Sequence, residues 1–266
     1  MIWTLPPVLL FCPADRPDRY VKAADRAPAV ILDLEDAVHV DDKAAARTAM
    51  VQNPLDPART VVRVNPVGTE QHDADLQALA DTDYTMLMLA KAEGTDGFDV
   101  LRDYQLIALC ETAAGVLAAA ELAAHGSVIG LMWGAEDLVA SLGGTSSRTA
   151  DGVYRDVARH ARSSVLIAAG AHQKAAIDAV HVAIDDLDGL AIEARDAAGS
   201  GFSSSACIHP GQVEVILGTD RPSQAELEWA RAVMAEAAGQ SGAFRYGGNM
   251  IDEPVLRRAA NLLRRA

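Results

Sequence analysis

AVILDLE, at residues 29–35, is an apolar run that closes on the acidic residues Asp33 and Glu35. Its apolar residues are nearly continuous, whereas a strand with one face in water would alternate apolar and polar residues. A run of this kind is typical of a parallel strand that is covered on both faces. The stretch therefore favours an α/β fold and marks its acidic end as a candidate site.

Seven other segments share this strand-like character. They read VLLFC (8–12), TVVRVN (60–65), TMLMLAK (85–91), LIALCE (106–111), VIGLMWG (128–134), AIDAVHVAI (176–184) and SSACIHP (204–210). The stretches between them have helical character: one begins at Asp41–Lys43, Thr112 caps another, and a third runs from Tyr154 to about Ala171. Eight strands alternating with helices predict a (β/α)8 TIM barrel, and a doubly wound open sheet is the alternative.

The tail of the chain differs from the barrel segments. Pro222 and Ser223 open a helix to about Gly239, and a last helix is expected from Glu253 to Ala266. The sequence contains neither an internal repeat nor an obvious linker. We therefore expect a catalytic barrel domain at residues 1–218 with a C-terminal helical extension at residues 219–266.

The composition limits the function classes. A formal net charge of −14 argues against a nucleic-acid or anionic-membrane role, because both need a broad basic surface. Cys12, Cys110 and Cys207 lie in apolar runs without a CxxC pair, which suits buried thiols in a reducing compartment. The N-terminal residues lack a signal-peptide pattern, so a cytoplasmic protein is expected.

Polar residues recur where the predicted strands end. They are Asp33, Glu35, Asp36, Arg63, Asn65, Lys91, Glu111, Glu136, Asp137 and His209. The carboxyl ends of TIM-barrel strands meet at one mouth, where active sites lie. Several carboxylates there repel one another, and a hard divalent cation, Mg²⁺ or Mn²⁺, relieves that repulsion better than zinc. Arg63 suits a carboxylate or an enolate oxygen, while Lys91 suits a salt bridge, a point charge or a Schiff base.

A short basic strip follows the first predicted strand. Arg16, Arg19 and Lys22 recur at three-residue spacing, as on one side of a helix. Such a strip can bind phosphates at the barrel rim, or it can be an ordinary solvated helix face. Spacing alone leaves both interpretations open.

Taken together, these segments resemble a known family. LFCPADRPDRYVKA, ILDLEDAV, VVRVN, AKAE, ETAAGV, GLMWGAEDL, CIHPGQV and GAFRYGGNMIDEPVLRRA occur in the order found in the citrate lyase beta subunit and its relatives. Those relatives include malyl-CoA, citramalyl-CoA and other 3-hydroxyacyl-CoA lyases. The resemblance covers nearly the whole chain, and it implies a TIM barrel that assembles as a homotrimer or hexamer.

The resemblance also implies roles for individual residues. Glu111 and Asp137 correspond to the metal ligands. Arg63 corresponds to the arginine that stabilises the enolate, and Asp252 to an acid/base that reaches a neighbouring subunit's site. Glu35 and Asp36 are implied catalytic residues that border the metal site. The implied substrate contacts are Gly134 and Ala135 together with Arg63, Glu111 and Asp137, and the implied CoA contacts are Arg16, Arg19 and Lys22.

The implied reaction is a magnesium-dependent cleavage or formation of a 3-hydroxyacyl thioester, which joins a 2-oxo acid to an acyl-CoA. Three alternatives stay open at this point. They are a class II aldolase that acts on free hydroxy-oxo acids, a malyl-CoA-type thioesterase, and a non-catalytic subunit of a larger lyase complex.

Overall fold

The computed structural model describes residues 5–264 and divides into two compact units, Met1–Ile216 and Leu217–Ala266. The division falls within helix α8 (Pro210–Asp220), close to the boundary expected after residue 218. That the two parts are separate domains stays a prediction.

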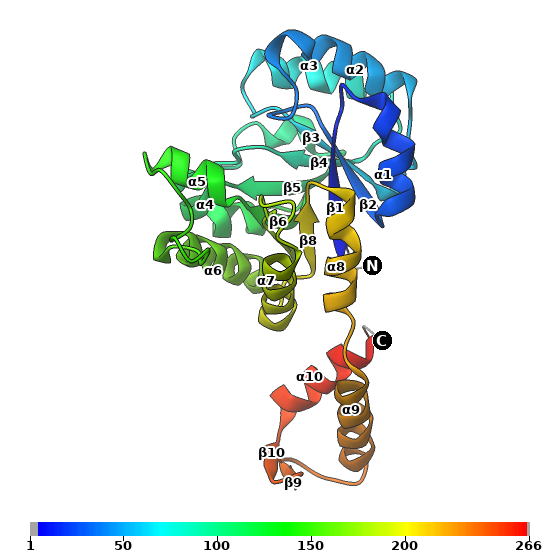
Figure 1. Ribbon diagram of the computed structural model, residues 1–266, viewed down its shortest axis with the longest axis vertical. Coiled ribbons are helices and arrows are strands. Elements are labelled where there is room, and N and C mark those ends of the chain that lie inside the picture. Colours follow the sequence, from blue (N-terminus) through cyan, green and yellow to red (C-terminus); the bar gives the residue numbers. More distant parts are fainter. Residues whose placement is uncertain (1–4, 265–266) are drawn as a thin grey trace. The chain divides into compact units, whose positions relative to one another are not determined.

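The first unit is built on a closed barrel of parallel strands (Figure 1). The strands are β1 (Val8–Pro13), β2 (Ala29–Asp33), β3 (Thr60–Val64), β4 (Met86–Leu89), β5 (Gln105–Cys110), β6 (Val128–Trp133), β7 (Ala175–Asp178) and β8 (Ser204–Cys207). Each strand pairs with the next, and β8 pairs with β1 through Leu9 and Ala206. The predicted TIM barrel is confirmed, and the open-sheet alternative is wrong because β1 and β8 close the ring.

Helices follow the strands around the outside of the barrel (Figure 1). They are α1 (Tyr20–Arg26), α2 (Lys43–Gln52), α3 (Glu70–Leu79), α4 (Ala113–Ala124), α5 (Ala135–Ser141), α6 (Asp156–Ala171), α7 (Leu187–Ser200) and α8, with 3-10 turns η1 (Pro17–Arg19), η2 (Val40–Asp42), η3 (Pro57–Arg59) and η4 (Phe98–Leu101). Thr112 caps α4 as predicted, since its hydroxyl accepts a hydrogen bond from the Gly115 N–H at 3.0 Å.

Alternation along the strands decides which side chains reach the barrel interior. The interior core contains Ile31, Val61 and Leu109 together with side chains from the other strands. Successive strand residues point to opposite faces, so the residues two positions farther along, Asp33, Arg63 and Glu111, continue the inward-facing rows. The polar strand ends thus stand directly above the apolar core.

Several predicted segments extend past the observed strands. The largest difference is at residues 176–184, where β7 ends at Asp178 and the rest is a loop. Helix α6 begins at Asp156, because Tyr154 instead forms an isolated β-bridge with Arg148. These differences lengthen the loops at the carboxyl ends of the strands and supply additional residues to the barrel mouth.

The second unit contains helix α9 (Gln224–Ala237), strands β9 (Phe244–Tyr246) and β10 (Asn249–Ile251), and helix α10 (Glu253–Arg264). The predicted N-cap Ser223 forms a capping box with Glu226. The two expected helices are present, and the stretch between them, for which no element is predicted, forms the antiparallel β9–β10 hairpin. The predicted end of the last helix, Ala266, lies outside the described residues.

Within residues 5–264, none of the helices combines the length and the apolar character that a membrane crossing requires.

Candidate active site

Arg63 and Asp33 form the base of the site. They are register partners on β3 and β2, and both point into the barrel. Arg63 donates Nε to Asp33 Oδ1 at 2.7 Å and Nη2 to Asp33 Oδ2 at 2.6 Å, while its guanidinium lies 5.0 Å from the centre of the Phe11 ring. The two-point pairing fixes the plane of the guanidinium. Burial opposes the charge of Arg63, but the hydrogen bonds to Asp33 together with the negative charges of Asp33, Glu35 and Glu111 raise its pKa, so Arg63 is a permanent cation.

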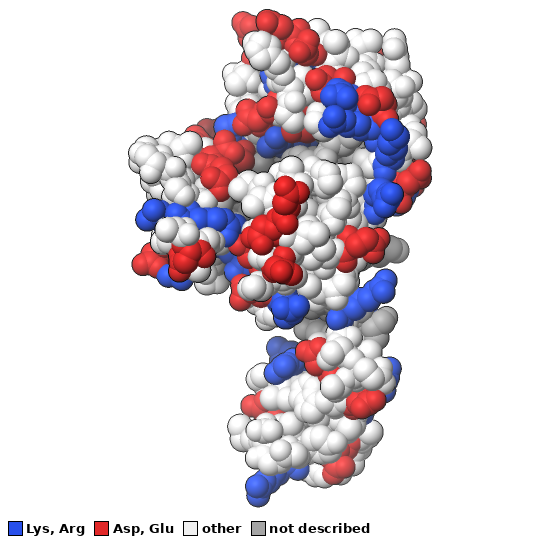
Figure 2. Space-filling view, viewed as in Figure 1, with Lys and Arg blue, Asp and Glu red and all other residues white. Residues whose placement is uncertain are grey.

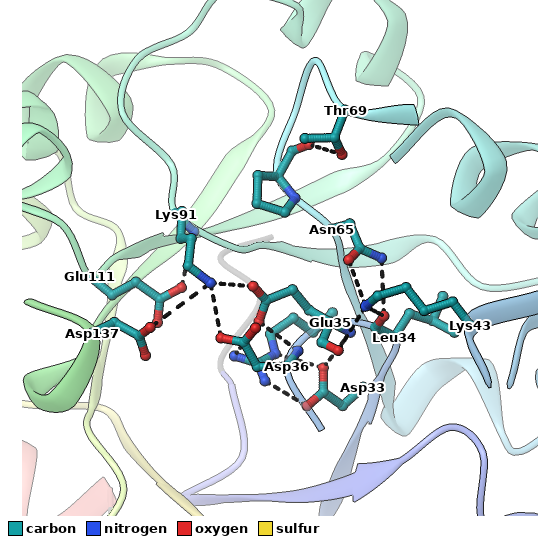
Figure 3. A network of polar contacts seen from close by, with 12 residues as sticks. Asp33, Leu34, Glu35, Asp36, Lys43, Asn65, Thr69, Lys91, Glu111 and Asp137 are labelled. Atoms are coloured by element: carbon teal, nitrogen blue, oxygen red, sulfur yellow. Dashed lines mark hydrogen bonds and ion pairs between the residues drawn. The ribbon is translucent and has the colours of Figure 1, made fainter. Parts of the chain in front are cut away.

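The turn after β2 places Glu35 and Asp36 at the same mouth (Figure 3). Lys43 supports this turn from behind, because its buried ammonium donates to the Leu34 carbonyl at 2.8 Å and the Glu35 carbonyl at 2.9 Å. It also donates to Asn65 Oδ1 at 2.8 Å. Glu35 is almost fully buried and lies 3.3 Å from Arg63 Nη1, whereas Asp36 is exposed. Burial raises the pKa of Glu35 despite the neighbouring cations.

Lys91 links the carboxylates across the mouth (Figure 3). Its Nζ contacts Glu35 Oε1, lies 2.9 Å from Asp36 Oδ2, and lies 3.9 Å from Asp137 Oδ1. Burial opposes the charge of Lys91, but the hydrogen bonds to Glu35 and Asp36 raise its pKa well above the ordinary value. An ammonium held in this way is a poor nucleophile, so the salt-bridge interpretation fits the geometry and the Schiff-base interpretation does not.

Glu111, directly after β5, and Asp137, in the first turn of α5, lie beside each other at the mouth (Figure 3). Glu111 is buried and accepts a hydrogen bond from the Lys91 backbone N–H at 3.0 Å. Burial and then the nearby charge of Asp137 raise the pKa of Glu111 to about 8. Gly134 leaves the room that Glu111 needs, since a Cβ at that position would lie 2.8 Å from Glu111 Cβ and 3.0 Å from Oε2. Ala135 begins α5 directly after this glycine.

These carboxylates fit a divalent cation. A hard cation stabilises the buried carboxylate of Glu111 against the half-exposed carboxylate of Asp137 that repels it, and oxygen donors are the ligands that Mg²⁺ and Mn²⁺ prefer. Within the described part of the chain, no group of three or more His, Cys, Asp or Glu side chains is placed to hold a metal ion. A cation bound by Glu111 and Asp137 would therefore keep most coordination positions open for substrate and water.

A second polar network lies beside β6 and β7, and sequence reasoning missed it. The Trp133 indole N–H donates to Asp178 Oδ1 at 2.6 Å, and Arg162 pairs with both oxygens of Asp178 at 2.9 and 2.8 Å. His181 Nδ1 lies 2.9 Å from Glu193 Oε2. Asp178 follows an apolar run just as Asp33 does, so the strand-end signal was present in the sequence. The pairings are not visible there, because the partners lie on other elements: Trp133 on β6, Arg162 on α6 and Glu193 on α7.

The basic strip is only partly helical. Arg16 precedes η1 and lies 3.3 Å from Asp18, Arg19 ends η1, and Lys22 lies in α1. All three basic side chains are exposed, and Figure 2 shows basic side chains over this part of the barrel. Exposure leaves them free to meet an anionic ligand, and their role in CoA binding stays a prediction.

Asp252 belongs to the second unit, between β10 and α10, where its Oδ1 accepts a hydrogen bond from the Val255 N–H at 3.4 Å. His209, the polar residue after β8, is exposed and accepts a hydrogen bond from the Gly211 N–H through Nδ1 at 3.1 Å. The structure thus brings Arg63, Glu35, Asp36, Glu111 and Asp137 together, and Asp252 stays a prediction that depends on assembly.

The chain combines a TIM barrel, carboxylates at the barrel mouth and an arginine that Asp33 holds at two points, and these features are typical of metal-dependent barrel enzymes. Residues 8–100 and 99–210 match the HpcH/HpaI aldolase/citrate lyase family. A citrate lyase subunit beta-like protein of Mycobacterium tuberculosis is 55% identical over 260 residues, which cover 98% of this chain and 95% of that protein. A (3S)-malyl-CoA thioesterase of Cereibacter sphaeroides is 35% identical over 240 residues, which cover 85% of this chain and 81% of that protein.

Among solved structures, the CitE protein of Mycobacterium tuberculosis in complex with magnesium, acetoacetate and coenzyme A superimposes with a TM-score of 0.95. The two chains are 54% identical, and the match covers 98% of each. This chain therefore belongs to the HpcH/HpaI aldolase/citrate lyase family and is a carbon–carbon lyase of the citrate lyase beta-like type. The resemblance inferred from the sequence motifs is confirmed.

Proposed function

We propose that this enzyme is a magnesium-dependent lyase that cleaves or forms a 3-hydroxyacyl thioester, such as a malyl-, citramalyl- or citryl-CoA-like compound. The products of cleavage are a 2-oxo acid and an acyl-CoA. The observation that carries the proposal is the meeting of Glu111 and Asp137 beside the clamped Arg63 at the barrel mouth.

Different residues of the site would carry out different parts of the cleavage reaction. Glu111 and Asp137 would hold the cation, whose chemistry is to neutralise the substrate carboxylate and acidify the 3-hydroxyl group. As the hydroxyl proton passes to a water molecule, the bond between carbons 2 and 3 of the acyl chain breaks. The hydroxyl-bearing carbon becomes the carbonyl of the 2-oxo acid, and the electron pair moves into the thioester enolate.

Arg63 is suited to stabilise that enolate. Asp33 already holds the guanidinium in place, so little reorganisation is needed when negative charge develops on the thioester oxygen. Glu35 and Asp36 complete the polar wall of the site. Gly134 and Ala135 place the start of α5 against the substrate, and Arg16, Arg19 and Lys22 are suited to the phosphates of CoA.

Asp252 is proposed as the acid that protonates the enolate from a neighbouring subunit, in a homotrimer or hexamer. Its carboxyl group lies at the start of α10, in a unit apart from the barrel. A residue carried on such an appended segment is available to a second copy of the chain. This role accounts for the proton that the acyl-CoA product requires.

The relatives support this assignment at the level of ligands. The solved CitE protein contains magnesium, acetoacetate and coenzyme A, which together match a cation, an oxo acid and a thioester carrier. A second candidate is thioester hydrolysis after the same enolate chemistry, because a relative at 35% identity is a (3S)-malyl-CoA thioesterase. The free-acid aldolase and the non-catalytic subunit are the remaining alternatives.

One assay separates these functions. Purified protein is offered acetyl-CoA or propionyl-CoA with glyoxylate, pyruvate or oxaloacetate, with magnesium or with a chelator, while condensed acyl-CoA and free CoA are both followed. Magnesium-dependent condensation without CoA release supports the lyase, and CoA release after condensation supports the thioesterase. No reaction with any pair contradicts a stand-alone acyl-CoA lyase and favours a free-acid aldolase or a subunit that needs partners.

A further inference from the structure

Lys91 has an unusual backbone conformation for a residue that only forms a surface salt bridge. Its φ of 50° lies in the left-handed region, which a residue with a side chain rarely adopts. In this conformation the Lys91 N–H points at Glu111 Oε1, 3.0 Å away, while the side chain projects over the mouth. The backbone therefore orients one proposed metal ligand, and the side chain is directed at other acidic residues.

The ammonium of Lys91 stands among carboxylates from two sides of the mouth. Glu35 and Asp36 approach it from the turn after β2, and Asp137 approaches it from α5. The side chain of Lys91 is 30% exposed, while that of Glu35 is 4% exposed, so the pair is shielded from bulk water on the Glu35 side. Asp137 is the most distant of the three, which leaves it the freest to bind another cation.

The position of the Lys91 ammonium affects how many protein carboxylates can coordinate a metal ion at the mouth. As they stand, these carboxylates do not form a group of three that could hold a metal among the described residues, and the ammonium of Lys91 holds Glu35 and Asp36 on their own side of the mouth. Without that ammonium the two side chains are free to turn toward Glu111 and Asp137, and a divalent cation bound there would take up further carboxylates in most of its coordination positions. A substrate that must chelate the same cation would then be excluded.

We infer that Lys91 is a positioning residue that keeps Glu35 and Asp36 away from the metal and so limits the protein ligands to Glu111 and Asp137. The inference rests on the metal site proposed above. Lys91 thereby preserves open coordination positions for the hydroxy or oxo acid, at the cost of weaker metal binding. This predicts that loss of the ammonium strengthens metal binding, whereas a residue with a merely structural role would weaken it when replaced.

The test is a Mn²⁺ titration of Lys91→Met, followed by electron paramagnetic resonance and by water-proton relaxation. Methionine keeps the backbone N–H to Glu111 and a similar unbranched length, so the change removes the charge of the ammonium and its hydrogen bonds to Glu35 and Asp36. We expect Mn²⁺ affinity to rise by about tenfold or more, because a positive charge near the ligands is lost and two carboxylates are released. The relaxation enhancement per bound Mn²⁺ should fall as carboxylates displace water.

Two further variants control for misfolding and for simple charge effects. Lys91→Arg keeps the cation, so its Mn²⁺ affinity should remain at the wild-type level. Adding Glu35→Gln and Asp36→Asn to Lys91→Met should return the affinity to the wild-type level or below, because the extra ligands are then gone. Circular dichroism on each variant confirms that the barrel is folded.

The outcomes are distinguishable. If folded Lys91→Met binds Mn²⁺ with the same affinity as the wild-type protein or more weakly, the role of Lys91 is overturned. The proposed metal site is not affected by that result as long as the wild-type protein binds Mn²⁺. If the wild-type protein itself binds no Mn²⁺, the metal site of the proposed function fails and the inference fails with it.

Discussion

Arg63 is a largely buried cation whose position is fixed by its acidic neighbours. Its guanidinium is bound at two points by Asp33, whose side chain is 1% exposed, and it also meets Glu35. The inward position of both residues could be predicted from alternation along the strands, because each lies two residues beyond a core position. The Asp33–Arg63 pairing could not, since it depends on the register between β2 and β3.

Replacing Arg63 by lysine should lower kcat/KM for thioester cleavage by roughly 10²–10³-fold, because an ammonium cannot keep the two-point pairing with Asp33 and still face the enolate. Steady-state kinetics with a 3-hydroxyacyl-CoA measure the effect. Arg162→Lys is the matched control, since it alters an equivalent two-point pair with Asp178 outside the proposed site. Comparable losses in the two variants would contradict a specific role for Arg63.

The raised pKa of Glu111 predicts that metal binding depends on pH. Its pKa is raised to about 8 in the metal-free protein, so protons compete with the cation at neutral pH. Metal affinity should therefore rise with pH and level off above about pH 8, with proton release on binding below that pH. Isothermal titration calorimetry with Mn²⁺ in buffers of different ionisation enthalpy measures both effects. An affinity that does not change between about pH 6 and about pH 8.5, from roughly two units below the raised pKa to roughly half a unit above it, would contradict the role of Glu111 as a ligand.

At the scale of elements, apolar runs predicted the strands well but not where each one ends. Residues 179–184 continue the apolar pattern of β7, yet they form a loop whose His181 is held by Glu193 from α7. Such a side-chain contact between separate elements leaves no periodic signal in the sequence.

The β9–β10 hairpin, in contrast, has a recognisable turn motif in the sequence. Gly247 and Gly248 have φ of 56° and 85° and form the tight turn that a Gly-Gly pair between strand-like residues indicates.

Trp133 is expected to stabilise the junction of β6, β7 and α6. Trp133→Phe removes the hydrogen bond to Asp178 and reduces the volume of a fully buried side chain, which should cost about 1–3 kcal/mol of unfolding free energy. For a chain of this size, thermal unfolding should shift down by several degrees, roughly 2–4 °C per kcal/mol. Trp229→Phe, at a partly buried position in the second unit, should shift it less. An equal shift for both would contradict the role of the Trp133–Asp178 contact.

At the scale of the whole molecule, the family, the barrel and the identity of the strand-end residues could be predicted from the sequence. The subunit arrangement could not, because contacts between separate copies of a chain follow from the shapes and charges of folded surfaces and leave no local pattern in the sequence. The homotrimer or hexamer and the two-domain division are predictions that light scattering and limited proteolysis can test. The face of the molecule in Figure 2 carries acidic patches over the barrel, in keeping with the net charge of −14.

Subunit mixing tests whether Asp252 acts on a neighbouring site. Glu111→Gln and Asp252→Asn should each be inactive alone, since one loses a metal ligand and the other the proposed acid. After the two variants are unfolded and reassembled together, some sites combine an intact Glu111 with an intact Asp252 from the adjacent subunit. We expect lyase activity to reappear in the mixture, and its absence from mixed oligomers of verified composition would contradict the trans role.

The most direct test of the central claim is the magnesium dependence of thioester cleavage in Glu111→Gln compared with the wild-type enzyme. Glutamine keeps the shape of the side chain and its contact with the Lys91 N–H, but it removes the charge that would bind the cation. The account predicts that the wild-type enzyme is inactive in chelator and activated by Mg²⁺. It also predicts that folded Glu111→Gln loses about 10³-fold or more in kcat/KM and binds Mg²⁺ far more weakly. Full activity with unchanged Mg²⁺ affinity in Glu111→Gln would contradict it.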